Sequence, residues 1–110
     1  MDSYIFKLCK NVVRENWTKS PLYHKIIDSR RQNEGYLCAK CNNIHPREMI
    51  YIEHIVPVAL HDTQTVEEYY QAVFNPDNCQ VWCYGCKPAK DALDIKLIQS
   101  KKFLIKAKQR

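Results

Sequence analysis

The stretch Ile-Glu-His-Ile-Val-Pro, at positions 52–57, is the centre from which we interpret this sequence. It places an acidic residue beside a histidine, and one Cys-x2-Cys pair stands on each side of it. Cys38 and Cys41 precede the stretch, and Cys83 and Cys86 follow it. Four thiolates in two such pairs can form a closed tetrahedral zinc site of the structural kind. The sequence therefore predicts a small zinc-stapled domain, with a reactive or binding centre in the stretch between the pairs.

Other interpretations of the cysteine pairs are a redox dithiol and ordinary buried cysteines. Redox Cys-x-x-Cys motifs sit at the start of a helix in a thioredoxin-like pattern, and no such pattern is visible in this sequence. The doubled spacing favours structural zinc, while a thiol redox or zinc-sensing protein stays open as a weaker hypothesis. Cys9, on the apolar side of a predicted helix, and Cys79 are interpreted as packing residues.

The chain of 110 residues has the size of one domain. A chain this short buries only a modest core, so a metal staple would help to stabilise it. It contains no apolar run long enough to span a membrane, and its first residues lack the basic flank and apolar core of a signal peptide. We therefore expect one cytoplasmic domain over residues 1–110, in which the cysteines stay reduced and the two pairs serve as metal ligands rather than as disulfides.

Positive charge is concentrated towards the C-terminal end. The chain has 17 Lys and Arg against 12 Asp and Glu, a net charge of +5, and no acidic residue follows Asp94. A basic segment of this kind tracks phosphates in some proteins and is a solvated tail in others. The residues that we expect to contact nucleic acid are Lys90, Lys96, Lys101 and Lys102, and the basic segment continues through Lys106, Lys108 and Arg110.

Apolar spacing and capping residues predict the other elements. Helices are expected over residues 4–13, from Pro21 to about Gly35, from Thr65 through Phe74, and from Pro88 onward. Ser20 before a proline, and Thr65 three residues before a glutamate, are typical of helix starts. Strands are expected over residues 47–55 and 80–82, and Trp17 is interpreted as a packing anchor.

Three separated motifs resemble those of the HNH endonucleases. They are Glu-His-Ile-Val-Pro at 53–57, Asn-Pro-Asp-Asn-Cys-Gln-Val-Trp-Cys at 75–83, and Cys-Lys-Pro-Ala-Lys at 86–90. The chain is most similar to small phage and bacterial members with a four-cysteine zinc site, which read acid-His-Ile-x-Pro, Asn-Leu-Gln-x-x-Cys and Cys-His-x-x-Lys in the same order. The resemblance covers residues 30–93 and favours a phage or mobile-element origin, with the protein acting inside a bacterial cell.

The resemblance implies an α+β fold with a ββα-metal, treble-clef-like core at residues 35–93. Two N-terminal helices (1–34) would precede this core, and a basic C-terminal helix (94–110) would follow it. The implied activity is metal-dependent hydrolysis of phosphodiester bonds in double-stranded DNA. In that pattern His54 is the general base, a task that suits a histidine at neutral pH. Glu53 is a ligand of Mg²⁺, Mn²⁺ or another divalent ion, and Asn78 holds the loop that orients the histidine.

The sequence departs from the family pattern at Lys87, where the family has its second metal-binding histidine. A protonated lysine has no lone pair for a metal, so Glu53 would hold the ion weakly. Three arrangements are open: His45 or His61 supplies the missing ligand, Lys87 contacts the phosphate itself, or Lys87 pairs with Glu53. The last arrangement predicts a catalytically degenerate module that binds DNA, or a host or phage protein that handles nucleic acid, without cutting.

Overall fold

Within residues 3–108, which the computed structural model describes, the chain forms four α-helices and two small antiparallel sheets. The helices are α1 (Ser3–Trp17), α2 (Pro21–Asp28), α3 (Val66–Val73) and α4 (Lys87–Lys108). Side chains are described up to Lys102, so the later basic residues Lys106, Lys108 and Arg110 lie outside the described side chains. Among the described residues, no helix combines the length and the apolar character that crossing a membrane requires.

One sheet lies beside the first cysteine pair, and the other carries the acid–histidine pair. The first has the strand order β1 (Arg31–Gln32), β2 (Gly35–Leu37) and β3 (Ile44–His45), and it lies next to the first cysteine pair. The second pairs β4 (Ile50–His54) with β5 (Cys79–Cys83). In this second sheet Glu53 lies opposite Gln80, and His54 lies opposite Cys79. The acid–histidine pair therefore stands at the end of a strand, where the chain leaves the sheet.

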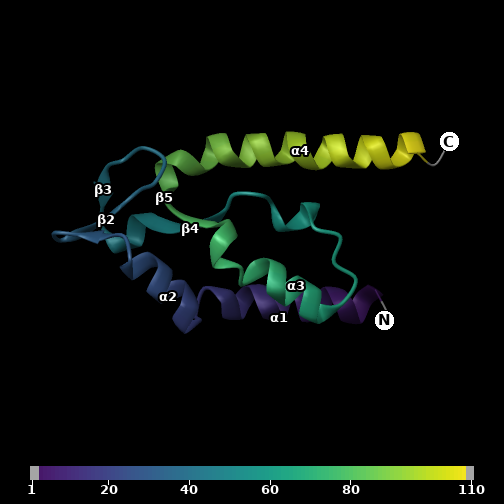
Figure 1. Ribbon diagram of the computed structural model, residues 1–110, viewed down its shortest axis with the longest axis horizontal. Coiled ribbons are helices and arrows are strands. Elements are labelled where there is room, and N and C mark those ends of the chain that lie inside the picture. The colour runs from purple at the N-terminus through teal and green to yellow at the C-terminus, as the bar shows by residue number, and fades with distance from the viewer. Residues whose placement is uncertain (1–2, 109–110) are drawn as a thin grey trace.

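The β4–β5 sheet lies between helices (Figure 1). Helix α4 runs along one side of it, while α1, α2 and α3 lie on the other side. Helix α1 packs along α3, and α2 packs against β4. The largest fully buried side chains join these layers, because Ile27 comes from α2, Ile50 and Val81 from the sheet, and Val73 from α3. The start of α1 and the end of α4 lie towards the same end of the molecule, on opposite sides of it.

Several predicted elements are confirmed. The Ser20 side chain accepts a hydrogen bond from the Tyr23 N–H and caps α2, and Pro21 is its first residue. The Thr65 hydroxyl accepts from the Glu68 N–H and caps α3, as its capping-box sequence predicts. Trp17 is buried at the end of α1, in agreement with its interpretation as a packing anchor.

Two predicted boundaries are wrong. The second helix ends at Asp28 rather than near Gly35, because Arg31 begins a hairpin that pairs with Tyr36. Its turn contains Asn33 at φ 55°, a left-handed conformation that asparagine adopts more readily than most residues. No side chain fits at Gly35, since a Cβ atom there would lie 2.5 Å from the Ile44 side chain and 2.9 Å from the His45 carbonyl oxygen. The strand predicted over residues 47–55 starts at Ile50, after a 3-10 turn over Arg47–Met49.

Candidate functional site

The four cysteines of the two Cys-x2-Cys pairs come together, as predicted. Cys38 and Cys41 follow β2, Cys83 ends β5, and Cys86 immediately precedes α4. The sulfur atoms all lie within 4.8 Å of one another. The Cys38–Cys86 distance is 4.0 Å, the Cys41–Cys83 distance is 3.8 Å and the Cys83–Cys86 distance is 3.5 Å. Sulfurs about 2.3 Å from a tetrahedral zinc are about 3.8 Å apart, so this cluster has the geometry to hold a metal such as zinc.

The environment of the cluster favours a thiolate at Cys38. Burial opposes ionisation of this thiol, but backbone N–H groups of Cys41, Cys83 and Lys40 together outweigh that effect and lower its pKa to about 7. The Cys83 N–H lies 3.2 Å from the Cys38 sulfur. Hydrogen bonding to Cys83 raises the pKa of Cys86 above its usual range. A metal ion would favour the thiolate form of all four cysteines, because it binds thiolates and releases their protons.

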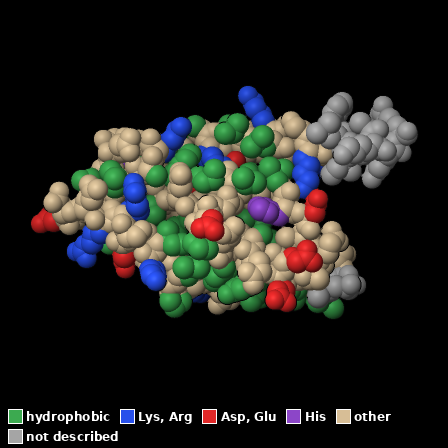
Figure 2. Space-filling model, viewed as in Figure 1, with side chains coloured by type: hydrophobic (Ala, Val, Ile, Leu, Met, Phe, Trp, Pro, Cys, Tyr) green, Lys and Arg blue, Asp and Glu red, His purple; other side chains and the backbone are tan. Residues whose placement is uncertain are grey.

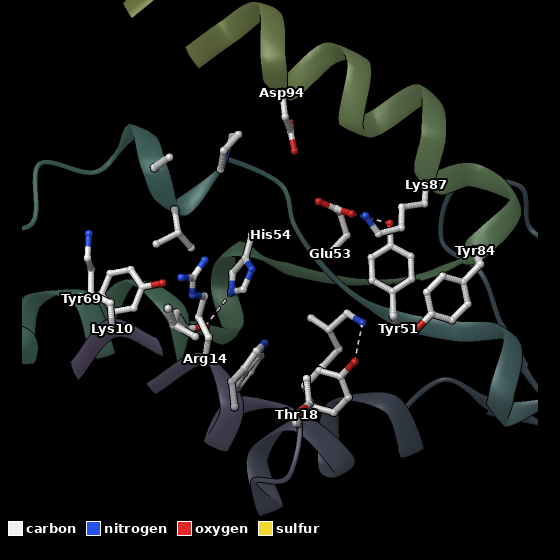
Figure 3. A pocket seen from close by; sticks show the side chains of 17 residues that line it. Lys10, Arg14, Thr18, Tyr51, Glu53, His54, Tyr69, Tyr84, Lys87 and Asp94 are labelled. Atoms are coloured by element: carbon white, nitrogen blue, oxygen red, sulfur yellow. Dashed lines mark hydrogen bonds between the residues drawn. The ribbon is translucent and has the colours of Figure 1, made fainter. Parts of the chain in front are cut away.

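A second centre is a cleft of about 630 Å³ between α1, β4, α3 and α4. Figure 3 shows His54 near the middle of this cleft, with Glu53, Lys87, Tyr51 and Tyr84 to one side of it. Glu53 and His54 both line the cleft, although they are adjacent in sequence.

The His54 ring is oriented by residues from two helices. Its Nε2 atom lies 2.8 Å from the Val73 carbonyl oxygen at the end of α3. A carbonyl oxygen can only accept, so Nε2 must carry the hydrogen, and in the neutral ring the lone pair is then on Nδ1. The ring also packs on the indole of Trp17, with 5.9 Å between ring centroids. His54 is therefore held in one tautomer with a basic nitrogen left over.

The loop after His54 is tied down by Asn78. The Asn78 side-chain oxygen accepts from the Val56 N–H at 2.9 Å, and its side-chain nitrogen donates to the Val56 carbonyl at 2.8 Å. The Ile55 N–H donates to the Asn78 backbone carbonyl at 2.9 Å. Together these bonds fix the backbone that immediately follows the histidine.

Glu53 is buried and already has partners. One carboxylate oxygen accepts from the Tyr51 hydroxyl, and the other lies 3.6 Å from the Lys90 ammonium. Lys90 also pairs with Asp94, one helical turn further along α4. Burial and the hydrogen bond to Glu53 raise the pKa of Tyr51, so this hydroxyl stays protonated and donates. Lys90, which the sequence predicts as a nucleic-acid contact, is 6% exposed and lies beside Glu53 and Asp94.

Lys87 has a different partner from the one considered in the sequence. Its ammonium lies 2.8 and 3.1 Å from the two carboxylate oxygens of Asp91. The hydrogen bond to Asp91 raises the pKa of Lys87, so it remains charged. The lysine paired with Glu53 is therefore Lys90, one turn later on α4, and of the three arrangements left open for Lys87 its ion pair with Glu53 is not the one observed.

Neither histidine considered as a replacement ligand lies in this cleft. His45 is in β3, with its Nε2 atom 3.5 Å from the Cys41 sulfur, so it lies beside the cysteine cluster. His61 lines a separate pocket together with Glu67 and Glu68.

The residues of the cleft do not fit the divalent ion that the sequence pattern implies. Both oxygens of Glu53 are engaged, one by a hydroxyl and one by a buried ammonium. The position of the second ligand is occupied by the charged Lys87, which has no lone pair and would repel a cation. The Lys90 ammonium thus lies where a metal ion would bind Glu53.

The lysines of α4 that the sequence predicts as nucleic-acid contacts differ in whether they already have partners in the protein. Lys101 donates to the Leu60 carbonyl at 2.5 Å and pairs with Asp62 at 2.8 Å, so it fastens α4 to the loop after β4. Lys96 and Lys102 are exposed. On the face shown in Figure 2, separate Lys and Arg side chains lie along α4 and over other elements.

Helix α1 contributes residues to the cleft that the sequence interpretation left out. Lys10 and Arg14 line it, and so does Tyr69 of α3. The spacing of four residues places Lys10 and Arg14 on one face of α1, with Trp17 on the turn that follows. This periodicity is visible in the sequence, but the position of α1 beside His54 is not.

Comparisons with protein-family models, curated proteins and solved structures give no match to this chain. The chemistry of the cleft combines a fixed histidine with a basic nitrogen, a tied loop beside it, and several cations. These features suit proton abstraction next to a negatively charged group.

Proposed function

We propose that this protein is an HNH-type endonuclease that hydrolyses phosphodiester bonds in DNA, with His54 as the general base. The observation that carries the proposal is the hydrogen bond from His54 Nε2 to the Val73 carbonyl oxygen. It leaves Nδ1 as the proton acceptor in a cleft that also contains Lys10, Arg14 and Lys87. A neutral imidazole beside cations is the combination that attack on an anionic ester requires.

In the proposed reaction, His54 takes a proton from a water molecule as the water oxygen attacks phosphorus. The bond from phosphorus to one sugar oxygen then breaks, and that oxygen takes up a proton from solvent. Negative charge on the phosphate is balanced by the ammonium and guanidinium groups of the cleft. No step is assigned to a divalent ion, because Glu53 is engaged by Lys90 and Tyr51.

The order of elements supports the proposal. β4, β5 and α4 form two strands and a helix, and the cysteine cluster joins the end of β5 to the start of α4. This is the order that a ββα-metal core would have. Asn78 bonds the backbone at Val56, next to the proposed base, which is the role that the HNH pattern would give it.

The test is nicking of supercoiled plasmid by the zinc-loaded protein, without added divalent ion and with Mg²⁺, Mn²⁺ or Ni²⁺. We expect nicking by the wild type and a loss of about 100-fold or more in His54→Ala, the usual size of a general-base effect. His24→Ala is the matched control, since His24 is exposed on α2 and does not line the cleft. Nicking retained in His54→Ala contradicts the assignment of the base.

A second candidate function is nucleic-acid binding without cleavage. The Lys90–Glu53 ion pair favours it, because this pair leaves no free carboxylate for a catalytic ion. Under this proposal the wild type binds duplex DNA and does not nick it with any ion.

The two candidates are separated by a variant that restores a metal site. Lys87→His supplies a ligand, but Glu53 stays paired until Lys90 is also changed. The variant is therefore Lys87→His with Lys90→Met, checked for folding by circular dichroism. Metal-dependent nicking by this variant together with an inactive wild type supports the binding module, whereas nicking by the wild type supports the nuclease.

A further inference from the structure

Two cations of α1 face the cleft without a carboxylate partner. Arg14 donates from its guanidinium to the Asn11 side-chain oxygen at 2.6 Å. The Lys10 ammonium lies 4.9 Å from the Phe6 ring centroid and 5.7 Å from that of Tyr69. Within the part of the chain that the structure describes, neither Lys10 nor Arg14 forms an ion pair.

The other lysines around the cleft have their charge balanced. Lys87 pairs with Asp91, and Lys90 lies between Glu53 and Asp94. The acidic side chains that line the cleft, Glu53 and Asp94, are thus both paired with Lys90 of α4. An excess of positive charge remains on the α1 side, where it attracts an anion.

Figure 3 shows on which side of His54 this excess positive charge lies. Lys10 and Arg14 rise from α1 on one side of His54, and Glu53 and Lys87 lie on the other. The Arg14 charge also acts on Tyr69, where it opposes the rise in pKa that burial causes. Arg14 and Tyr69 both line the cleft.

We infer that Lys10 and Arg14 form a binding site for the phosphodiester backbone of duplex DNA, next to the position where His54 acts. The identity of the ligand rests on the proposed function. A guanidinium binds phosphate oxygens as a planar fork, and an ammonium adds a point charge. Since the two residues are one helical turn apart, they contact phosphates along one strand and hold it across the cleft.

This site adds to the DNA contacts that the sequence predicts on α4, where Lys96 and Lys102 are exposed. Lys90 and Lys101 of α4 are occupied by contacts inside the protein. Phosphate contacts fix the register of the DNA without reading its bases. The α1 site therefore predicts binding that depends strongly on salt and little on base sequence.

The experiment measures binding of the zinc-loaded full chain to a fluorescein-labelled DNA duplex by fluorescence anisotropy, over a series of salt concentrations. The variants are Lys10→Met, Arg14→Gln and the double change, which remove charge and keep much of the side-chain length. Lys25→Met is the matched control, because Lys25 is exposed on α2 and does not line the cleft. Circular dichroism and zinc content verify that each variant folds.

Each phosphate contact contributes about 0.9 to the slope of log K against log salt. We expect the slope to become less steep by about 1 in each single variant and by about 2 in the double variant, with weaker binding at every salt concentration. Lys25→Met keeps the wild-type slope. The inference is overturned if the double variant binds like Lys25→Met, or if the wild type does not bind the duplex.

Parallel nicking assays separate this inference from the proposed nuclease. Weaker binding by the α1 variants, with no nicking by the wild type, supports the α1 site and rejects the nuclease. Nicking that requires His54, with unchanged salt slopes in the α1 variants, rejects the α1 site and keeps the nuclease.

Discussion

The Lys90 ammonium lies 3.6 Å from a carboxylate oxygen of Glu53, and both residues are buried, at 6% and 8% exposed. This contact joins α4 to β4. It neutralises the carboxylate that the HNH pattern would use for a metal, and it brings Asp94 into the same group of charges. Its energetic weight can be measured.

Lys90→Met should destabilise the protein by about 3–5 kcal/mol, the usual cost of removing one partner from a buried ion pair. The change leaves the charge of Glu53 inside the protein with the Tyr51 hydroxyl as its remaining bonded partner among the described residues. Urea unfolding followed by circular dichroism gives the free energy of unfolding.

Lys87→Met is the matched control for this prediction. Lys87 also pairs with an aspartate four residues later on α4, but the two side chains are 42% and 49% exposed. Exposed pairs of this kind contribute at most about 1 kcal/mol. Equal losses of unfolding free energy in Lys90→Met and Lys87→Met would show that the buried Lys90 ion pairs stabilise the protein no more than the exposed pair does.

Tyr23→Phe should destabilise the protein by about 1–3 kcal/mol, because its hydroxyl accepts a hydrogen bond from the Ile52 N–H at 3.2 Å. That N–H belongs to β4 and is buried, so it is left unsatisfied in the variant. Urea unfolding measures the effect.

The control for Tyr23→Phe is Tyr70→Phe. Tyr70 is 43% exposed and packs on Phe74 through its ring, so loss of its hydroxyl should cost little. A loss in Tyr70→Phe as large as that in Tyr23→Phe would argue against the role of the Ile52 bond.

Asn78→Ala should free the backbone at Val56 and cost about 1–3 kcal/mol, since two hydrogen bonds to backbone groups are lost. The direct measurement is amide hydrogen exchange by NMR, in which the Val56 N–H should exchange faster. The Ile55 N–H is an internal reference, because it bonds the Asn78 backbone carbonyl, which the substitution keeps.

Asn78→Asp refines this prediction. It keeps an oxygen to accept from the Val56 N–H, but it loses the donor and places a carboxylate beside the Val56 carbonyl. The Val56 N–H should therefore stay protected while stability falls. Rapid exchange of this N–H in Asn78→Asp would mean that another contact holds the loop.

The protein should contain one zinc ion per chain, and removal of that ion should unfold the region around it. The cysteine cluster links the segment after β2 to the end of β5 and the start of α4. Metal binding of this type contributes directly to folding free energy. Elemental analysis gives the zinc content, and circular dichroism after chelation gives the structural loss.

Cys38→Ser should lose the zinc ion, whereas Cys79→Ser should keep it. Cys79 lies outside the cluster, and its thiol donates to the Asn75 carbonyl at 3.1 Å, a bond that a serine hydroxyl can also make. Full zinc content in Cys38→Ser would contradict the assignment of the ligands.

Prediction from the sequence succeeded where the signal is local. The capping residues Ser20 and Thr65 lie within three residues of the N–H groups that they accept from, so the helix starts follow from short spacing. It failed at the end of α2, where residues 31–45 form three short strands. These strands contain two or three residues each, which is too few for a period-2 pattern to be recognised.

By itself, the sequence determined the cysteine cluster, the helix starts, and the strand that ends at Glu53 and His54. Each of these depends on residues close together in the chain or on a repeated spacing. The tertiary structure decided which cation meets which anion. Lys87 and Lys90 are three residues apart on α4, and the packing of this helix places Lys90 in the ion pair with Glu53 while Lys87 pairs with Asp91. In the same way, packing of α1 along α3 brings Lys10 and Arg14 to the cleft of His54. Contacts between elements distant in the chain have no signature in local spacing, because burial and charge pairing arise only when those elements pack.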